Sequence, residues 1–273
     1  MVWLYFIFLT YFLFFLHRGC FFLFPILHMV ETPPPNTHEE IYLDNEMGCW
    51  MYPPRSTTSE QDKIMVYFNG NAGNVSTRIA NIHILQQILP EYRIYNLEYP
   101  GFGLSASLPL WLPSIVEECE TACRHIIEKH PRMHTLGFWG ESLGALVAAH
   151  VFSSLKDHVR WVVHMNGVAS LHDTIAEFVP PLLQALILPV LPSVPLDAIH
   201  CYQELDHQTI VLMHAKNDEV VSESQSQLLY LALKSKYPDQ IHYLEWRGKH
   251  NSVLHQKENQ EAVQELFETL RMT

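Results

Sequence analysis

Short apolar runs alternate with amphipathic segments along most of the chain, and this alternation limits what the chain can fold into. The apolar runs have the length of buried strands, whereas apolar residues spaced three and four apart indicate helices. Strands that alternate with helices predict a mostly parallel sheet covered on both faces, with its chemistry at the carboxyl ends of the strands. We expect strands at 40–52 (one or two, around a turn at 45–48), 63–68, 93–97, 135–139, 160–165, 209–214 and 241–246, and helices at 75–89, 114–129, 145–155, 224–234 and 256–270.

The first thirty residues differ from everything that follows. Residues 2–30 are apolar except for a short polar interruption, and their one formal charge is Arg18. As a helix they would span about 43 Å at ~1.5 Å per residue, which exceeds the ~30 Å hydrocarbon core of a bilayer. We therefore expect residues 1–30 to form a transmembrane anchor, or an uncleaved signal-like segment. The proline-rich residues 31–36 would be a spacer before a globular domain at 37–273.

A cleaved signal peptide and a buried core helix are the alternatives for this segment. A signal peptide should begin with a basic residue and end at a small-residue cleavage site, and the segment has neither. A core helix should show a polar face, which the segment also lacks. The expected protein is thus a single-pass membrane protein, and Arg18 after the first apolar run favours a cytoplasmic globular domain.

Composition excludes several classes of protein. The 273 residues carry a net charge of −12, so a nucleic-acid partner has no basic surface to bind. Apolar residues make up 48% and charged residues 17%, which is typical of a chain with a packed core. The five cysteines include no C-x-x-C pair, so we expect neither a disulfide framework nor a zinc site. Cys119 and Cys123, four apart on an expected helix, are better explained as buried small side chains than as half of a metal site.

The most specific motif is Gly140-Glu141-Ser142-Leu143-Gly144, between the strand at 135–139 and the helix at 145–155. A G-x-S-x-G sequence between a strand and a helix holds its serine on a strained turn with the hydroxyl exposed. Glycines on either side let the strand and helix approach without Cβ clashes. The N–H of Leu143, at the start of the helix, can donate to an oxyanion. The chain has only 11 glycines, so this placement favours a nucleophilic Ser142 over an ordinary turn.

A second turn, Asn69–Asn74, follows the strand at 63–68 and precedes a helix. A glycine-containing loop in this place can supply another oxyanion N–H. The alternative is a phosphate-binding loop, but the loop lacks both the G-x-G-x-x-G spacing and the Walker lysine.

Two further turns supply a candidate acid and a candidate base. Asp218 follows the strand at 209–214, where a carboxylate can hold an imidazole in one tautomer; Glu219 is its nearest rival. His250 follows the last strand, and a lone histidine among 17 means little by itself. The order along the chain distinguishes it, because Ser142, Asp218 and His250 follow the Ser, Asp, His order of α/β-hydrolases. His242, inside a strand, and His255, one turn further on, are the alternatives.

Taken together, these motifs resemble the membrane-anchored ABHD13/ABHD17/Bem46-like group of α/β-hydrolases, over roughly residues 37–271. The resemblance implies the α/β-hydrolase fold, and the hydrophobic N-terminus fits the same group. One departure is Asn69, which stands where that group usually has histidine. In that group the position helps to shape the loop and transfers no proton, so the resemblance implies that activity survives the change. The segments that carry the resemblance are FNGNAGN (68–74), LEYPGFGLS (97–105), GESLG (140–144), HAKNDEVV (214–221) and KHNSV (249–253).

The resemblance implies a serine hydrolase that cleaves esters, thioesters or amides through an acyl-enzyme. His250 would accept the Ser142 proton and Asp218 would orient His250, while N–H groups of Leu143 and of Asn71 or Ala72 stabilise the oxyanion. Neither a metal nor an organic cofactor is implied. Two other classes remain open: a non-catalytic membrane interaction protein on this scaffold, and an aminopeptidase-like hydrolase.

An insertion at about 168–206 bears on the substrate. Its segment 178–198 is apolar, contains five prolines and has no charge before Asp197. It can pack over the core, form a small apolar cap that lines an acyl-chain site, or rest on a membrane. Beside a membrane anchor, the insertion favours lipid-like small molecules or acylated proteins as substrates.

Overall fold

The computed structural model describes residues 37–56, 62–71, 73–108, 112–178 and 197–270. Within these ranges no helix combines the length and the apolar character needed to span a bilayer. The expected anchor at 1–30 and the spacer at 31–36 lie outside the described residues, as does Ala72. Most of the apolar stretch of the insertion, 179–196, lies outside them too.

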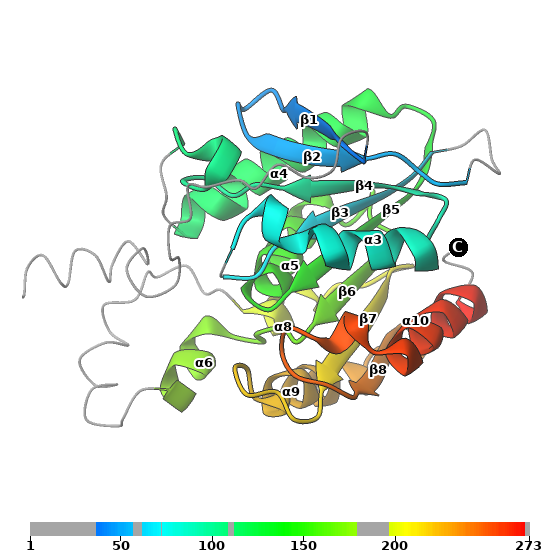
Figure 1. Ribbon diagram of the computed structural model, residues 1–273. Coiled ribbons are helices and arrows are strands. Elements are labelled where there is room, and N and C mark those ends of the chain that lie inside the picture. Colours follow the sequence, from blue (N-terminus) through cyan, green and yellow to red (C-terminus); the bar gives the residue numbers. More distant parts are fainter. Residues whose placement is uncertain (1–36, 57–61, 72, 109–111, 179–196, 271–273) are drawn as a thin grey trace, which may run out of the picture.

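Eight strands of the described residues form one sheet in the order β1-β2-β4-β3-β5-β6-β7-β8 (Figure 1). The pairs β1–β2 and β2–β4 are antiparallel, and every other neighbouring pair is parallel. The expected mostly parallel sheet is therefore confirmed. The strands are β1 (Glu39–Tyr42), β2 (Gly48–Tyr52), β3 (Asp62–Phe68), β4 (Tyr92–Leu97), β5 (Met133–Glu141), β6 (Trp161–Met165), β7 (Thr209–Ala215) and β8 (Ile241–Trp246).

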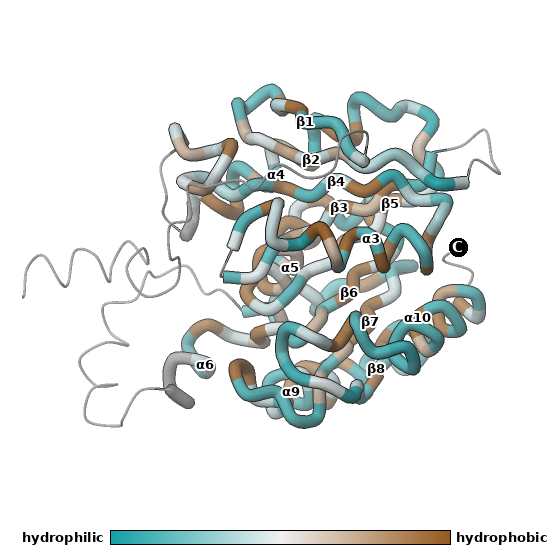
Figure 2. Tube along the Cα trace, in the orientation of Figure 1, coloured by the Kyte–Doolittle hydropathy of each residue, from teal (hydrophilic) through white to brown (hydrophobic). Residues whose placement is uncertain are grey.

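Helices cover both faces of the sheet. Side chains alternate between the two faces along each strand, so each strand contributes to a core on either side. In β5, Phe138 packs into the core shared with α4, α5 and α9, whereas Trp139 packs into the opposite core with α3 and α10. Hydrophobic stretches lie along the central strands, while α10 is largely hydrophilic on its outer side (Figure 2). The helices are α3 (Ile79–Ile88), α4 (Leu112–Lys129), α5 (Leu143–Leu155), α6 (Leu171–Phe178), α8 (Ala198–Cys201), α9 (Glu223–Lys234) and α10 (Lys257–Thr269), with 3₁₀ turns η1 (Val75–Arg78), η2 (Gly103–Ser105) and η4 (Val253–His255).

The expected elements lie where the sequence placed them, with small shifts at their ends. The segment expected as one helix at 75–89 begins as η1, where the Asn74 side chain accepts a hydrogen bond of 3.1 Å from Ser76 N. Strand β5 is longer than expected and continues to Glu141, directly before Ser142. Cys119 and Cys123 are buried on α4 without a disulfide, which confirms their interpretation as core residues.

Glu98, at the end of β4, is a buried carboxyl group that the sequence analysis did not single out. The residue is 1% exposed, and its Oε2 has no hydrogen-bond partner in the part of the chain that the structure describes. Burial raises the pKa of Glu98 to about 8, and the N–H groups of Val75 and Leu104 offset this only in part. Glu98 is therefore mostly protonated in the folded chain at neutral pH.

We expect Glu98→Gln to remove a pH-dependent loss of stability. In the unfolded chain Glu98 ionises near pH 4.5, while in the folded chain it holds its proton up to about pH 8. The folded state thus binds more protons between these values, so stability falls as the pH rises through this window. The full shift corresponds to a penalty on the order of 5 kcal/mol above pH 8. Urea unfolding at pH 5 and pH 8.5 measures the free energy of unfolding. At pH 8.5 this free energy should be higher for the variant, relative to the wild type, than at pH 5. The exposed Glu258→Gln is the control, and an equal gain there would contradict the assignment.

Candidate active site

Ser142 lies in a strained turn, residues 140–144, between β5 and α5; this segment is called the serine turn below. Its backbone has φ 56° and ψ −122°, a conformation that residues with a Cβ rarely adopt. The flanking glycines are required by close contacts: a Cβ on Gly140 would lie 2.3 Å from Ala145 Cα, and one on Gly144 would lie 2.2 Å from the Phe68 carbonyl oxygen. The local geometry is therefore the one that the motif predicts.

The burial of Ser142 corrects one expectation. The sequence predicts an exposed hydroxyl, but the residue is only 7% exposed. The loop Asn69–Asn74, called the NGNAGN loop below, approaches it closely, since a Cβ on Gly70 would lie 3.4 Å from Ser142 Cβ. The backbone of this loop therefore lies against the serine.

Asp218 and His250 meet across the turns that follow β7 and β8. Asp218 Oδ2 and His250 Nδ1 are 2.7 Å apart, and the two side chains are 0% and 5% exposed. The N–H groups of Val220 and Val221 donate to Asp218 Oδ1 at 2.8 and 2.9 Å. Burial raises the pKa of Asp218, but the hydrogen bonds from His250 and these two N–H groups outweigh it, so the pKa is lowered. An ionised Asp218 keeps a proton on His250 Nδ1 and leaves Nε2 free to accept one.

The rivals considered from sequence occupy other positions. Glu219 accepts from the backbone N–H of His250 at 3.4 Å, whereas the ring Nδ1 pairs with Asp218. His242 lies in β8 with its ring bonded to the Asp239 carbonyl oxygen, and His255 is exposed at the end of η4. Among the described residues, no hydrogen bond joins Ser142 Oγ to His250. Catalytic contacts of this kind commonly tighten only when substrate binds.

Asn166 links the end of β7 to the turn that carries His250, a role that the sequence analysis missed. It follows β6 with φ 45°, a left-handed conformation that asparagine tolerates. Its Nδ2 donates to the His250 carbonyl oxygen at 2.7 Å, and its Oδ1 accepts from Ala215 N at 2.8 Å. The only sequence signal was its place, directly after a strand at the same sheet edge.

The NGNAGN loop is fixed to β4 by Asn69. Its Nδ2 donates to the Leu97 carbonyl oxygen at 2.6 Å, and its own carbonyl oxygen accepts from Tyr99 Oη at 2.8 Å. Of the candidate oxyanion donors, Asn71 is half-buried in this loop and Ala72 lies outside the described residues. Leu143 is the first residue of α5, so its N–H has no carbonyl partner within the helix.

The ends of the insertion at about 168–206 are close together. Ser170 and Asp197 form an antiparallel bridge. His150 Nε2 accepts a hydrogen bond of 3.2 Å from Asp197 N, and burial lowers the pKa of His150 to about 4, so this acceptor is neutral. The insertion therefore leaves and rejoins the domain at one place, beside α5.

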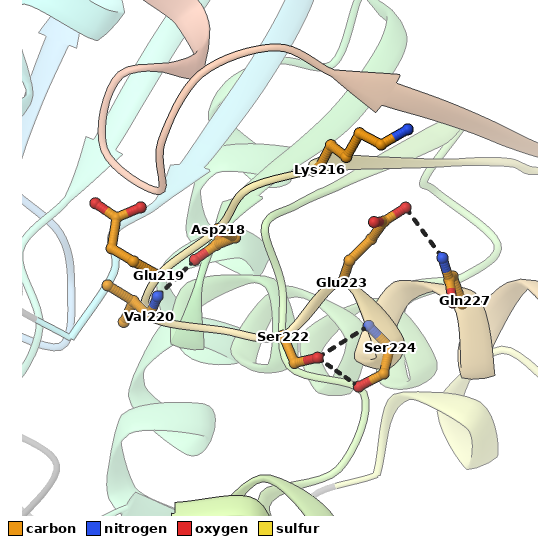
Figure 3. A pocket seen from close by; sticks show the side chains of 8 residues that line it. All are labelled: Lys216, Asp218, Glu219, Val220, Ser222, Glu223, Ser224 and Gln227. Carbon is orange, nitrogen blue, oxygen red and sulfur yellow. Dashed lines mark hydrogen bonds between the residues drawn. The ribbon is translucent and has the colours of Figure 1, made fainter.

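A polar depression of about 590 Å³ is lined by residues between 216 and 227, Asp218 among them (Figure 3). Glu219 and Glu223 border it, together with Lys216 and Gln227 (Figure 3). Neither Ser142 nor His250 lines it. Of the candidate catalytic residues, Asp218 alone lines this depression.

Comparisons with known proteins bear on the fold. No protein-family model matches the chain. The chain is 22% identical to the uncharacterized protein R595 of Acanthamoeba polyphaga mimivirus over 233 residues, which cover 81% of this chain and 78% of that one. It is 23% identical to the protein bem46 of Schizosaccharomyces pombe over 146 residues, or 53% of this chain and 46% of that one.

Solved structures match over more of the chain. The Pyrococcus furiosus esterase Pf2001 superposes with a TM-score of 0.68 at 16% identity, covering 92% of this chain and 99% of the esterase. An acylaminoacyl peptidase of Pyrococcus horikoshii gives a TM-score of 0.60 at 14% identity, covering 86% of this chain and 42% of the peptidase. At such identities the likeness concerns the fold. The chain has the α/β-hydrolase fold that the resemblance implied.

Proposed function

We propose that the chain is a serine hydrolase that cleaves ester, thioester or amide bonds with Ser142, His250 and Asp218. The observation that carries the proposal is the 2.7 Å hydrogen bond between Asp218 and His250. It occurs at the sheet edge where β5 delivers Ser142 in the strained serine turn. The esterase and peptidase with similar folds give it further support.

In the proposed mechanism, His250 Nε2 takes the Ser142 hydroxyl proton as Oγ bonds to the acyl carbon. The carbonyl electron pair moves onto oxygen, where the N–H of Leu143 and an N–H of the NGNAGN loop stabilise it. The tetrahedral intermediate then breaks its bond to the leaving group, which takes the proton from His250. Water repeats these steps on the acyl-enzyme, releasing the acid and restoring Ser142.

The substrate class is proposed from the apolar character of the insertion at about 168–206. The insertion begins and ends beside α5, the helix that follows Ser142, and its segment 178–198 is apolar in sequence. A lipid-like or acylated substrate, either a small molecule or a protein, would match such a cap. Amide substrates are the second candidate, favoured by the fold shared with acylaminoacyl peptidases.

We expect Ser142→Ala to abolish both ester hydrolysis and labelling by a fluorophosphonate probe. Without the hydroxyl no acyl-enzyme can form, so kcat should fall by about 10⁴-fold or more. The change removes one oxygen and no core packing, so the Tm should stay within a few degrees of the wild type. A variant that still labels would exclude Ser142 as the nucleophile.

The acid and base should behave as one unit. His250→Ala should cost nearly as much kcat as Ser142→Ala, because a neutral hydroxyl is a poor nucleophile without a base. Asp218→Asn should cost roughly 10³- to 10⁴-fold through loss of the correct tautomer. The double variant should be little worse than His250→Ala alone. Hydrolysis should also fall at acid pH, because a protonated His250 cannot accept the Ser142 proton.

Two matched variants serve as controls for this assignment. His255→Ala and Glu219→Gln should keep kcat/KM within a few-fold of the wild type on a p-nitrophenyl ester. Strictly additive losses at Asp218 and His250 would show two independent roles and contradict a triad.

Membrane attachment through residues 1–30 is part of the proposal. The full chain should sediment with membranes, because this segment would bury its apolar side chains in lipid. A chain that begins at Thr37 should stay in the supernatant and keep its activity on short water-soluble esters. Fractionation of both chains measures the difference, and a full chain that remains in the supernatant would contradict the anchor.

A further inference from the structure

We infer that Arg78 is a positioning residue that holds the NGNAGN loop against the serine turn through Glu141, an inference that rests on the proposed function. Arg78 Nε donates to Glu141 Oε2 at 2.8 Å, and the two side chains are 12% and 3% exposed. Glu141 directly precedes Ser142, whereas Arg78 ends the turn η1 that follows the NGNAGN loop. The ion pair therefore joins two segments that are 63 residues apart in the chain.

The Arg78 guanidinium also lies against both glycines of the loop. A Cβ on Gly70 would meet Arg78 Nη2 at 3.2 Å and Glu141 Oε1 at 3.4 Å, and a Cβ on Gly73 would meet Arg78 Nη1 at 3.2 Å. The guanidinium is thus packed beside the start and the end of the loop. A larger residue at either glycine would push against the ion pair.

A hydrogen-bonded chain continues from Arg78 into the loop end. Nη1 donates to Thr77 Oγ1 at 2.9 Å, and Thr77 Oγ1 donates to the Asn74 carbonyl oxygen at 2.7 Å. On the other side, Tyr67 Oη donates to Glu141 Oε2, so the carboxylate is also tied to β3. Arg78, Glu141 and their neighbours therefore connect β3, the loop, η1 and the serine turn.

Burial makes this connection stiff. A buried carboxylate or guanidinium without its partner is strongly unfavourable, so neither side chain can move away alone. Burial lowers the pKa of Arg78, but the Glu141 carboxylate outweighs it and raises the pKa above its usual value, which keeps the guanidinium charged. The loop needs such support because Gly70 and Gly73 leave its backbone with few internal restraints, and Gly73 has φ 97°.

The consequence for catalysis concerns the two oxyanion donors. Leu143 N–H belongs to the serine turn, whereas the N–H of Asn71 or Ala72 belongs to the loop. Their separation depends on how the two segments are held, and a misplacement of about 1 Å can cost ~100-fold in rate. Arg78 would act through the loop and turn without touching substrate, so its loss should lower kcat more than it raises KM.

The test uses the full chain in detergent, with p-nitrophenyl acetate as the probe. Arg78→Met should lower kcat by about 10- to 100-fold, with KM within about threefold. The apparent pKa of kcat/KM should not move, because Asp218 and His250 are untouched. Arg78→Lys should restore part of the loss, since it keeps the charge but not the planar contacts with the glycines. Glu141→Gln should lose less than Arg78→Met, because the amide oxygen can still accept from Arg78.

Arg124→Met is the matched control, since Arg124 pairs with Glu120 on the exposed side of α4. It should leave kcat and KM unchanged. Folded Arg78→Met with kcat within twofold of the wild type would overturn the inference. A shifted apparent pKa would also overturn it, because Arg78 would then act on the acid–base pair. If Arg78→Met does not fold, Arg78→Lys and Glu141→Gln replace it in the test. The same two measurements, kcat and the apparent pKa of kcat/KM, then decide. A wild type without Ser142-dependent hydrolysis would instead overturn the proposed function, which separates the two failures.

Discussion

The register of the parallel strands fixes where the candidate site forms. Phe68 of β3 pairs with Gly140 of β5, Glu141 pairs with Met165 of β6, Met165 pairs with Met213 of β7, and Ala215 pairs with Trp246 of β8. The strands therefore end nearly level with one another. The turns that follow them, which carry the NGNAGN loop, Ser142, Asn166, Asp218 and His250, share one edge of the sheet. A register shift in a single pair would separate residues that depend on one another.

Level strand ends alone do not hold the turns in place, and side chains from the turns supply the rest. Asn166 hydrogen-bonds to the backbone of Ala215 at the end of β7 and to the backbone of His250, and Asn69 hydrogen-bonds the NGNAGN loop to β4. These amides are buried, so each hydrogen bond also removes the cost of an unpaired backbone group. Two residues with side chains, Ser142 and Asn166, have positive φ in these turns. The strain lies at the candidate site, where the surrounding packing can maintain it.

The sequence could predict whatever depends on short-range pattern. The alternation of strands and helices, the glycines around Ser142 and the order of Ser142, Asp218 and His250 are all visible in the printed residues. Contacts between distant segments left no such signal. The Arg78–Glu141 pair could not be read from spacing, because its partners are 63 residues apart. The burial of Ser142 depends on the approach of another loop. No pattern in the sequence around Glu98 indicates that its carboxyl group is buried after β4.

Two histidines, His214 and His250, lie beside Asp218, and their surroundings differ. His250 Nδ1 lies 2.7 Å from Asp218 Oδ2, and His214 Nε2 lies 3.5 Å from the same oxygen. His214 is completely buried, and burial lowers its pKa. Its two nitrogens bond to Ser226 Oγ at 2.7 Å and to the Val221 carbonyl oxygen at 3.0 Å, so a neutral ring satisfies both contacts.

His214 therefore supports the turn that carries Asp218 as a neutral side chain, because its burial opposes protonation. A proton taken from Ser142 in the proposed mechanism would stay on His250, next to the ionised Asp218. The carboxylate would then stabilise one imidazolium although two imidazoles lie beside it. In the proposed mechanism, burial of His214 is the physical reason that Asp218 would stabilise a single protonated imidazole, that of His250.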